Sequence, residues 1–173
     1  MAHPLTWIMP VIPGKTPEEI FLKLAWYWPK VNAALKEIAT VHYARLVLFD
    51  LSQPDLRPCP IPKPGDRYTL ALITDFDGDM APYVNDFVAK IGDFFDAMLE
   101  FVVGGAEVIP VAQHVEAFAA LIGAGNLSQH APNNLLPLFE AYPYTVRQIA
   151  AANVPPDVPY LWPEAGGGKP ART

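Results

Sequence analysis

The stretches TVHYARLVLFD (Thr40–Asp50) and YTLALITDFDGD (Tyr68–Asp79) decide the fold of this chain. Both are rich in β-branched and aromatic residues, which is typical of β-strands. Apolar side chains occupy both faces of Val41–Phe49, and this predicts a central strand that is covered on both sides. The simplest arrangement pairs that strand antiparallel with Arg67–Thr74. Asp77-Gly78 then predicts a turn into the segment that follows.

That following segment predicts a long amphipathic helix over residues 81–103. Asp79 is the candidate N-cap, and Gly104-Gly105 is the stop signal. Apolar residues recur at helical spacing and form one wide face. They are Val84, Phe87, Val88, Ile91, Phe94, Phe95, Met98 and Val102.

Upstream, Leu5–Ile12 predicts a strand, and Pro10 within it indicates an edge position or an early exit from the sheet. Thr16-Pro17-Glu18-Glu19 is a strong helix start, with Thr16 as N-cap and Glu19 completing a capping box. Pro29 is expected to kink or end this helix, and a second short helix is predicted to run from Lys30 to about Ile38.

The first helix is predicted to place Ile20, Phe21, Leu24 and Trp28 on one stripe. The aromatic run Trp26-Tyr27-Trp28 is expected in the core or in a dimer contact rather than as a cofactor platform.

After the sheet, the chain alternates loops and short elements. Leu51–Asp66 holds five prolines and predicts an extended loop. Gln113–Ile122 predicts an inserted amphipathic helix, Leu136–Tyr144 a last strand, and Val146–Ala152 a short helix after Thr145. Pro and Gly dominate from Pro155 onward.

This order of elements predicts an α+β fold: a ferredoxin-like β-α-β-β-α-β sandwich with an inserted helix before the last strand. The predicted domain covers residues 1–154, and residues 155–173 form a C-terminal tail. Helices on one face of the sheet would leave the other face apolar, so the sequence predicts a homodimer with two sheets face to face.

Composition narrows the class of protein. Of the 173 residues 51% are hydrophobic and 17% charged, which is typical of a globular chain. The net charge of −6 argues against nucleic acid as a partner. The one cysteine, Cys59, excludes an intrachain disulfide, and no apolar run approaches a membrane span. We therefore expect a cytoplasmic protein with no membrane partner.

Two motifs add a family resemblance. His42-Tyr43-Ala44-Arg45, then Phe76-Asp77-Gly78 and Tyr83, resemble a group of bacterial ferredoxin-like proteins, and Tyr142–Ile149 resembles that group's last strand and helix. The group is similar in architecture to the dimeric α+β barrel superfamily, which includes antibiotic-biosynthesis-type monooxygenases, chlorite dismutases and dye-decolourising peroxidases. The resemblance spans roughly residues 5 to 152 and implies the fold more specifically than the function.

The candidate ligand-binding residues are His42, Arg45 and Tyr43. His42 is a candidate acid/base or ligand, or else a buried histidine bonded to a neighbouring loop. Arg45 is a candidate anchor for an anionic substrate, or else the partner of Asp75 or Asp77 in a salt bridge. In a regular strand His42 and Arg45, three residues apart, point to opposite faces.

Other clusters predict no metal site. Asp75, Asp77, Asp79 and Asp86 have the spacing of a calcium loop, but its sixth position is Met80 instead of glycine and its last ligand is Asp instead of Glu. His3, His114 and His130 lack metal-ligand spacing, and Cys59 in its proline loop is read as an incidental thiol.

Two functions remain from the sequence. The first is a domain that binds a small apolar or aromatic molecule between sheet and helices. The second, implied by the resemblance, is an oxidoreductase of the dimeric α+β barrel type, with His42 as the acid/base or haem-facing residue and Arg45 as the anion anchor. Haem is the cofactor that this second function would use.

Overall fold

The computed structural model describes residues 2–52, 67–129 and 144–151. Within them, β1 (Ala2–Pro10), β2 (Val41–Asp50) and β3 (Tyr68–Asp77) form one sheet in the order β1–β3–β2. Both neighbours run antiparallel to β3, as predicted for its pairing with β2. The prediction of a central position for β2 is wrong, because β3 is the middle strand of the described sheet.

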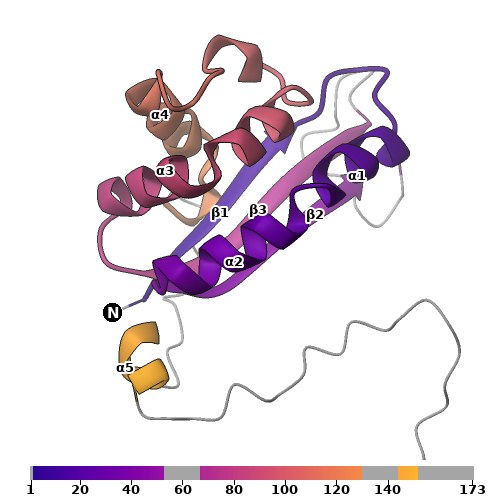
Figure 1. Ribbon diagram of the computed structural model, residues 1–173. Coiled ribbons are helices and arrows are strands. Elements are labelled where there is room, and N and C mark those ends of the chain that lie inside the picture. The colour runs from indigo at the N-terminus through magenta and orange to yellow at the C-terminus, as the bar shows by residue number, and fades with distance from the viewer. Residues whose placement is uncertain (1, 53–66, 130–143, 152–173) are drawn as a thin grey trace, which may run out of the picture.

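All four longer helices lie on one side of this sheet (Figure 1). They are α1 (Pro17–Ala25), α2 (Trp28–Ile38), α3 (Met80–Leu99) and α4 (Val115–Gly125). The short helices are η2 (Gly105–Glu107), η3 (Leu127–Gln129) and α5 (Val146–Ala151). The core lies between sheet and helices, and β1 contributes Leu5, Trp7 and Met9 to it, each 1% exposed.

The predicted start of α1 is confirmed in detail. The Glu19 N–H donates to Thr16 Oγ1 at 3.2 Å, and the Thr16 N–H donates to Glu19 Oε2 at 2.9 Å, which completes the capping box. Pro29 lies in the first turn of α2, where its missing N–H costs no hydrogen bond. Part of the predicted stripe is wrong: Ile20 and Leu24 are buried, whereas Phe21 and Trp28 are exposed.

The helix predicted over 81–103 is α3, which ends at Leu99, before the predicted stop at Gly104-Gly105. Asp79 occupies its N-cap position, although its side chain makes no capping hydrogen bond. Non-helical angles at Ile91 (φ −136°, ψ 30°) kink the helix. At its start Tyr83 stacks on Phe76 of β3, with 3.9 Å between ring centroids. Burial raises the pKa of the Tyr83 hydroxyl to about 12.

The inserted helix, α4, contributes buried residues to the hydrophobic core and is not a surface addition. It begins two residues later than predicted and continues past Gly123 to Gly125. Phe118 is fully buried, and its ring lies 5.8 Å from Trp7 of β1 and 5.1 Å from Phe95 of α3. These edge-on and tilted contacts join α4 to both the sheet and the helical layer.

The outer edge of β1 is bordered by the segments that follow α3 and α4. Val11 forms an antiparallel bridge with Val102, and Trp7 forms one with Asn126. The Thr6 N–H donates to Asn126 Oδ1 at 3.2 Å. In a ferredoxin-like sheet the fourth strand pairs along this edge, and here Asn126 occupies its middle.

The structure confirms an α+β fold with an antiparallel sheet of at least three strands. The predicted last strand, 136–144, lies outside the described residues apart from Tyr144, which has no regular structure. The domain boundary at 154 and the tail at 155–173 also lie outside them, so the ferredoxin-like topology and this boundary stay predictions. No helix in the described ranges is long and apolar enough to cross a membrane.

Candidate functional site on the open sheet face

One face of the sheet is turned away from α1–α4 (Figure 1). The middle of that face is apolar. Strand alternation and pairing register place Ile8, Val47, Phe49 and Ile73 together on it. All four are half-buried, and none belongs to the hydrophobic core or packs against it. We call these four residues the apolar floor.

A bulge in β2 brings the candidate residues together at one end of this face. The register shifts between Val41, which pairs with Phe76, and Tyr43, which pairs with Asp75. His42 is the extra residue, and its ring reaches Asp77, which lies by alternation on the same face as Asp75. The expectation that His42 and Arg45 point to opposite faces is therefore wrong, because a bulge cancels the regular alternation.

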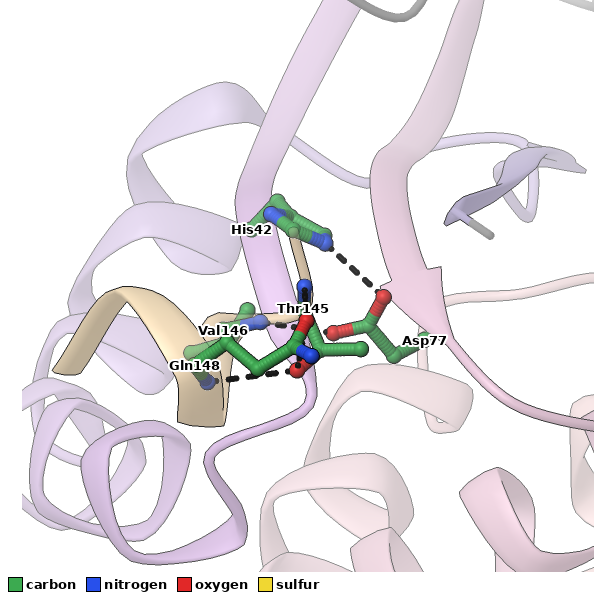
Figure 2. A network of polar contacts seen from close by, with 5 residues as sticks. All are labelled: His42, Asp77, Thr145, Val146 and Gln148. Carbon is green, nitrogen blue, oxygen red and sulfur yellow. Dashed lines mark hydrogen bonds and ion pairs between the residues drawn. The ribbon is translucent and has the colours of Figure 1, made fainter. Parts of the chain in front are cut away.

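Asp77 joins β2, β3 and α5. Its Oδ1 lies 3.0 Å from His42 Nε2, and its Oδ2 accepts a 2.8 Å hydrogen bond from the Val146 N–H (Figure 2). The His42 and Asp77 side chains are only 23% and 12% exposed. As a whole residue His42 is exposed, so it is not the buried histidine of the second reading; its ring is bonded, but to a strand carboxylate rather than to a loop.

The start of α5 is organised by its own side chains. The Gln148 N–H donates to Thr145 Oγ1 at 3.2 Å, and the Thr145 N–H donates to Gln148 Oε1 at 2.8 Å. This is a capping box of the Thr-x-x-Gln type. The capping box does not use the Val146 N–H, which instead donates a hydrogen bond to Asp77, as Figure 2 shows.

The charge state of Asp77 follows from these contacts. Burial alone would raise the pKa of its carboxyl, but the Val146 N–H and the His42 ring outweigh burial and lower that pKa. An ionised carboxylate only accepts hydrogen bonds, so His42 Nε2 must carry the proton that faces it. In the neutral form of the ring, Nδ1 is then the lone-pair nitrogen.

Arg45 and Asp75 lie on the same face without pairing. Neither side chain has a hydrogen bond or an ion pair to any described residue, and the alternative salt bridge from Arg45 to Asp75 or Asp77 is absent there. Arg45 is exposed and pairs in register with Ile73 of the apolar floor. Burial raises the pKa of the Asp75 carboxyl, and the charge of His42 offsets part of this effect.

The other sequence candidates contribute nothing to this site. His114 is the exposed N-cap residue of α4, and the His3 ring lies 6.0 Å from that of Phe76. His130 and Cys59 lie outside the described residues. Across the part of the chain that the structure describes, no three His, Cys, Asp or Glu side chains are grouped as metal ligands. Asp77 of the apparent calcium loop is used by His42 and Val146 instead.

The sequence interpretation named Asp77 as a possible partner of Arg45, and it missed the pairing of Asp77 with His42 and the first turn of α5. The Thr145-x-x-Gln148 spacing is a readable capping signal, but its docking onto Asp77 is a long-range contact that no local pattern contains. No protein-family model, no curated protein and no solved structure matches the chain. The family resemblance therefore stays a prediction.

Proposed function

We propose that this protein binds a small apolar or aromatic anion on the open sheet face, and that a second copy of the chain closes the site. The observation that carries the proposal is Arg45. Its exposed guanidinium has no partner among the described residues and lies beside the apolar floor. A free guanidinium at the border of an apolar surface suits a carboxylate or sulfonate attached to a hydrophobic body.

The polar end of the face supports the same function. Tyr43 is exposed and pairs with Asp75, whose carboxyl is partly desolvated. These groups supply a hydroxyl donor and an acceptor beside the cation, which is the small set of placed polar groups that a ligand site needs for orientation. His42 is fixed by Asp77 and adds a lone-pair nitrogen at the same end.

The dimer is supported by the apolar floor itself. Four aliphatic and aromatic side chains outside the core lie together on one sheet face, and such a face is stabilised when another surface covers it.

Ligand binding is tested on the full chain with 8-anilinonaphthalene-1-sulfonate, an aromatic anion whose fluorescence reports binding. We expect a saturable, salt-sensitive binding component that Arg45→Gln weakens by about 10-fold or more, the effect of losing a charge-assisted hydrogen bond. Lys36→Gln, which removes the same charge from an exposed site on α2, should leave it unchanged. Equal affinity of wild type and Arg45→Gln would overturn the proposal.

Self-association is tested by light scattering at micromolar concentration. We expect a species of twice the 19.0 kDa chain mass. Val47→Glu places a charge in the apolar floor and should give monomers with unchanged far-UV circular dichroism. Ala89→Glu, on the exposed side of α3, should remain dimeric. A wild-type species at the mass of one chain contradicts the dimer.

The alternative, an oxidoreductase, has one observation in its favour. A carboxylate that holds the ring of a histidine is the arrangement that orients a general base, and Asp77 holds His42 in this way. The geometry does not favour haem, because Nε2, the ring nitrogen that projects furthest from the strand, is bonded to Asp77. A Soret band that develops on haem titration and is lost in His42→Ala would contradict this assignment.

A further inference from the structure

The α1–α2 segment presents an apolar arc to the outside. Trp26 and Tyr27, between the two helices, keep right-handed helical angles (φ −57°, ψ −35° and φ −84°, ψ −12°), so the helical phase continues through the junction. At ~100° per residue, one arc of about 160° contains only apolar positions between residues 19 and 31, whereas Glu18, Asn32 and Lys36 continue the same side of the segment before and after them. These positions, here called the outer arc, are Phe21, Leu22, Ala25, Trp26, Trp28 and Pro29, and all are exposed.

The opposite side of the same segment faces the core. Ile20, Leu24 and Val31 are buried there, and Tyr27 packs against the core with its ring 6.2 Å from that of Phe94. Along residues 19–31, with Glu19, Lys23 and Lys30 as a polar strip, the segment thus has two apolar sides. The described residues cover only one of them.

The outer arc is unusually large for a free surface. Trp26 is 84% exposed, Leu22 72%, Phe21 69% and Trp28 57%. Together these side chains present on the order of 600 Å² of apolar area, at the upper end of the largest patch on an ordinary monomer. A patch of this size marks an interaction surface.

The polar groups that border the outer arc are already engaged. Lys23 pairs with Glu100 at 3.1 Å, Lys30 pairs with Asp93 at 2.7 Å, and Glu19 belongs to the capping box of α1. Between residues 19 and 31 the side-chain hydrogen-bonding groups of the arc are the two indole N–H groups, and the exposed polar residues Glu18, Asn32 and Lys36 lie at its two ends. A protein partner of standard size uses about ten hydrogen bonds and about 800 Å² on each side, and the arc offers neither.

We propose that the outer arc inserts into the interfacial layer of a lipid bilayer, with α1 and α2 lying in the plane of the membrane surface. Trp, Phe and Leu on one side of a helix are the residues that enter this layer, and an indole suits a place that is apolar at one end and wet at the other. The expectation of no membrane partner rested on the lack of a spanning run, and a surface-lying helix needs none.

Charge decides which lipid surface fits. The two bordering lysines are neutralised by Glu100 and Asp93, and the chain carries a net charge of −6. Anionic headgroups would repel the protein, whereas zwitterionic phosphatidylcholine would not. The outer arc lies on the helical side of the sheet, away from the apolar floor (Figure 1), so membrane contact and the proposed ligand site do not compete.

The experiment uses the full chain and phosphatidylcholine vesicles. We expect co-sedimentation, a blue shift of tryptophan emission and quenching by brominated acyl chains. Binding should be unchanged between 0.1 and 0.5 M salt and weaker when phosphatidylglycerol is added. Leu22→Gln/Trp26→Ser should weaken binding by 10-fold or more, and Trp28→Ser alone should weaken it measurably. Val103→Gln removes a comparably exposed apolar side chain outside the arc and should have no effect.

Three results would overturn the proposal. The first is a wild-type chain that neither sediments with the vesicles nor is quenched. The second is loss of binding in Val103→Gln equal to that in Leu22→Gln/Trp26→Ser. The third is a light-scattering mass that rises with concentration in the wild type and not in Leu22→Gln/Trp26→Ser, since the arc would then be covered by a second copy.

Discussion

Asp77 is the residue on which three distant segments converge, because it accepts hydrogen bonds from His42 of β2 and Val146 of α5. Asp77→Asn weakens the His42 contact and replaces a charged acceptor at the start of α5. We expect the free energy of unfolding at pH 7 to fall by about 1–2 kcal/mol. Hydrogen exchange at α5 should accelerate as well. Urea unfolding and exchange mass spectrometry measure the two effects.

The pH dependence of this variant has a defined sign. The pKa of Asp77 is lower in the folded chain than its unfolded value of ~3.9, so its stabilisation is present above that value and lost as the pH falls through the folded pKa. The difference between wild type and Asp77→Asn should therefore shrink as the pH falls below the unfolded value and through the folded pKa of Asp77. Asp79→Asn, in the same turn but without a capping hydrogen bond, is the matched control and should have little effect at either pH.

Asp75 is expected to behave in the opposite way. Burial raises the pKa of its carboxyl in the folded chain, so the ionised form destabilises the fold above that pKa and the effect disappears as the pH falls. Asp75→Asn should raise the free energy of unfolding at pH 7 by no more than about 0.5 kcal/mol, since the residue is partly solvated. The gain should vanish below about pH 4 in urea titrations. A less stable variant at pH 7 would show that the carboxylate has a stabilising partner.

For single residues, the sequence predicted correctly which strand carries the candidate site residues, but it predicted the orientation of their side chains wrongly. His42, Tyr43 and Arg45 do lie on β2, yet their common face depends on a bulge. A bulge adds one residue to one strand of a pair, and nothing in the letters HYAR distinguishes it from regular pairing. The link to Asp77 follows from that bulge and was equally unreadable.

The packing of α4 against β1 depends on one glycine. A Cβ atom at Gly125 would lie 2.7 Å from Trp7 Cδ1 and 2.8 Å from the Ile8 carbonyl oxygen. Gly125→Ala should therefore lower the free energy of unfolding by about 1–3 kcal/mol, because the backbone of β1 cannot yield without breaking its pairing. The midpoint of urea unfolding measures this loss.

Gly123 supplies the control on the same helix. A Cβ atom there would meet nothing within 4 Å, so Gly123→Ala should leave stability unchanged or raise it by up to about 1 kcal/mol through helix propensity. Equal effects of the two substitutions would contradict a close approach at Gly125.

Element starts were predictable where a local signal exists, as the capping box of α1 shows. Which side of α1 is buried was not, because Phe21 and Trp28 are as apolar as Ile20 and Leu24. Apolar residues on both the inner and the outer side of a helix leave no periodicity that marks the inner side. Only the position of the sheet decides it.

Phe118 links all the layers of the molecule, and this makes a prediction for global unfolding. Phe118→Ala should cost about 3–5 kcal/mol by leaving a cavity between Trp7 and Phe95. Far-UV circular dichroism and Trp fluorescence should still report one coincident transition, since α4 belongs to the common core. Phe21→Ala, at an exposed site, should cost less than about 1 kcal/mol. Two separate transitions would mean that α4 folds independently.

For the whole molecule, the order of strands and helices was enough to predict an α+β fold with antiparallel pairing. The predictions that were wrong concern contacts between segments far apart in the chain. The helix read as an insertion fills the core, and a loop residue, Asn126, occupies the edge where a fourth strand was expected. Such contacts depend on how whole elements pack, which no single window of sequence records.

The edge of β1 also bears on how the protein avoids aggregation. Pro4, Thr6, Ile8 and Pro10 alternate along that edge, and the Thr6 N–H donates outward to Asn126. Pro4 and Pro10 have no N–H, and the Thr6 N–H already donates to Asn126. Of these four residues, only Ile8 is left with an N–H that could pair with a strand of another molecule. We therefore expect the described edge of β1 to be a poor template for amyloid-like pairing, although the strand carries no charged gatekeeper residue.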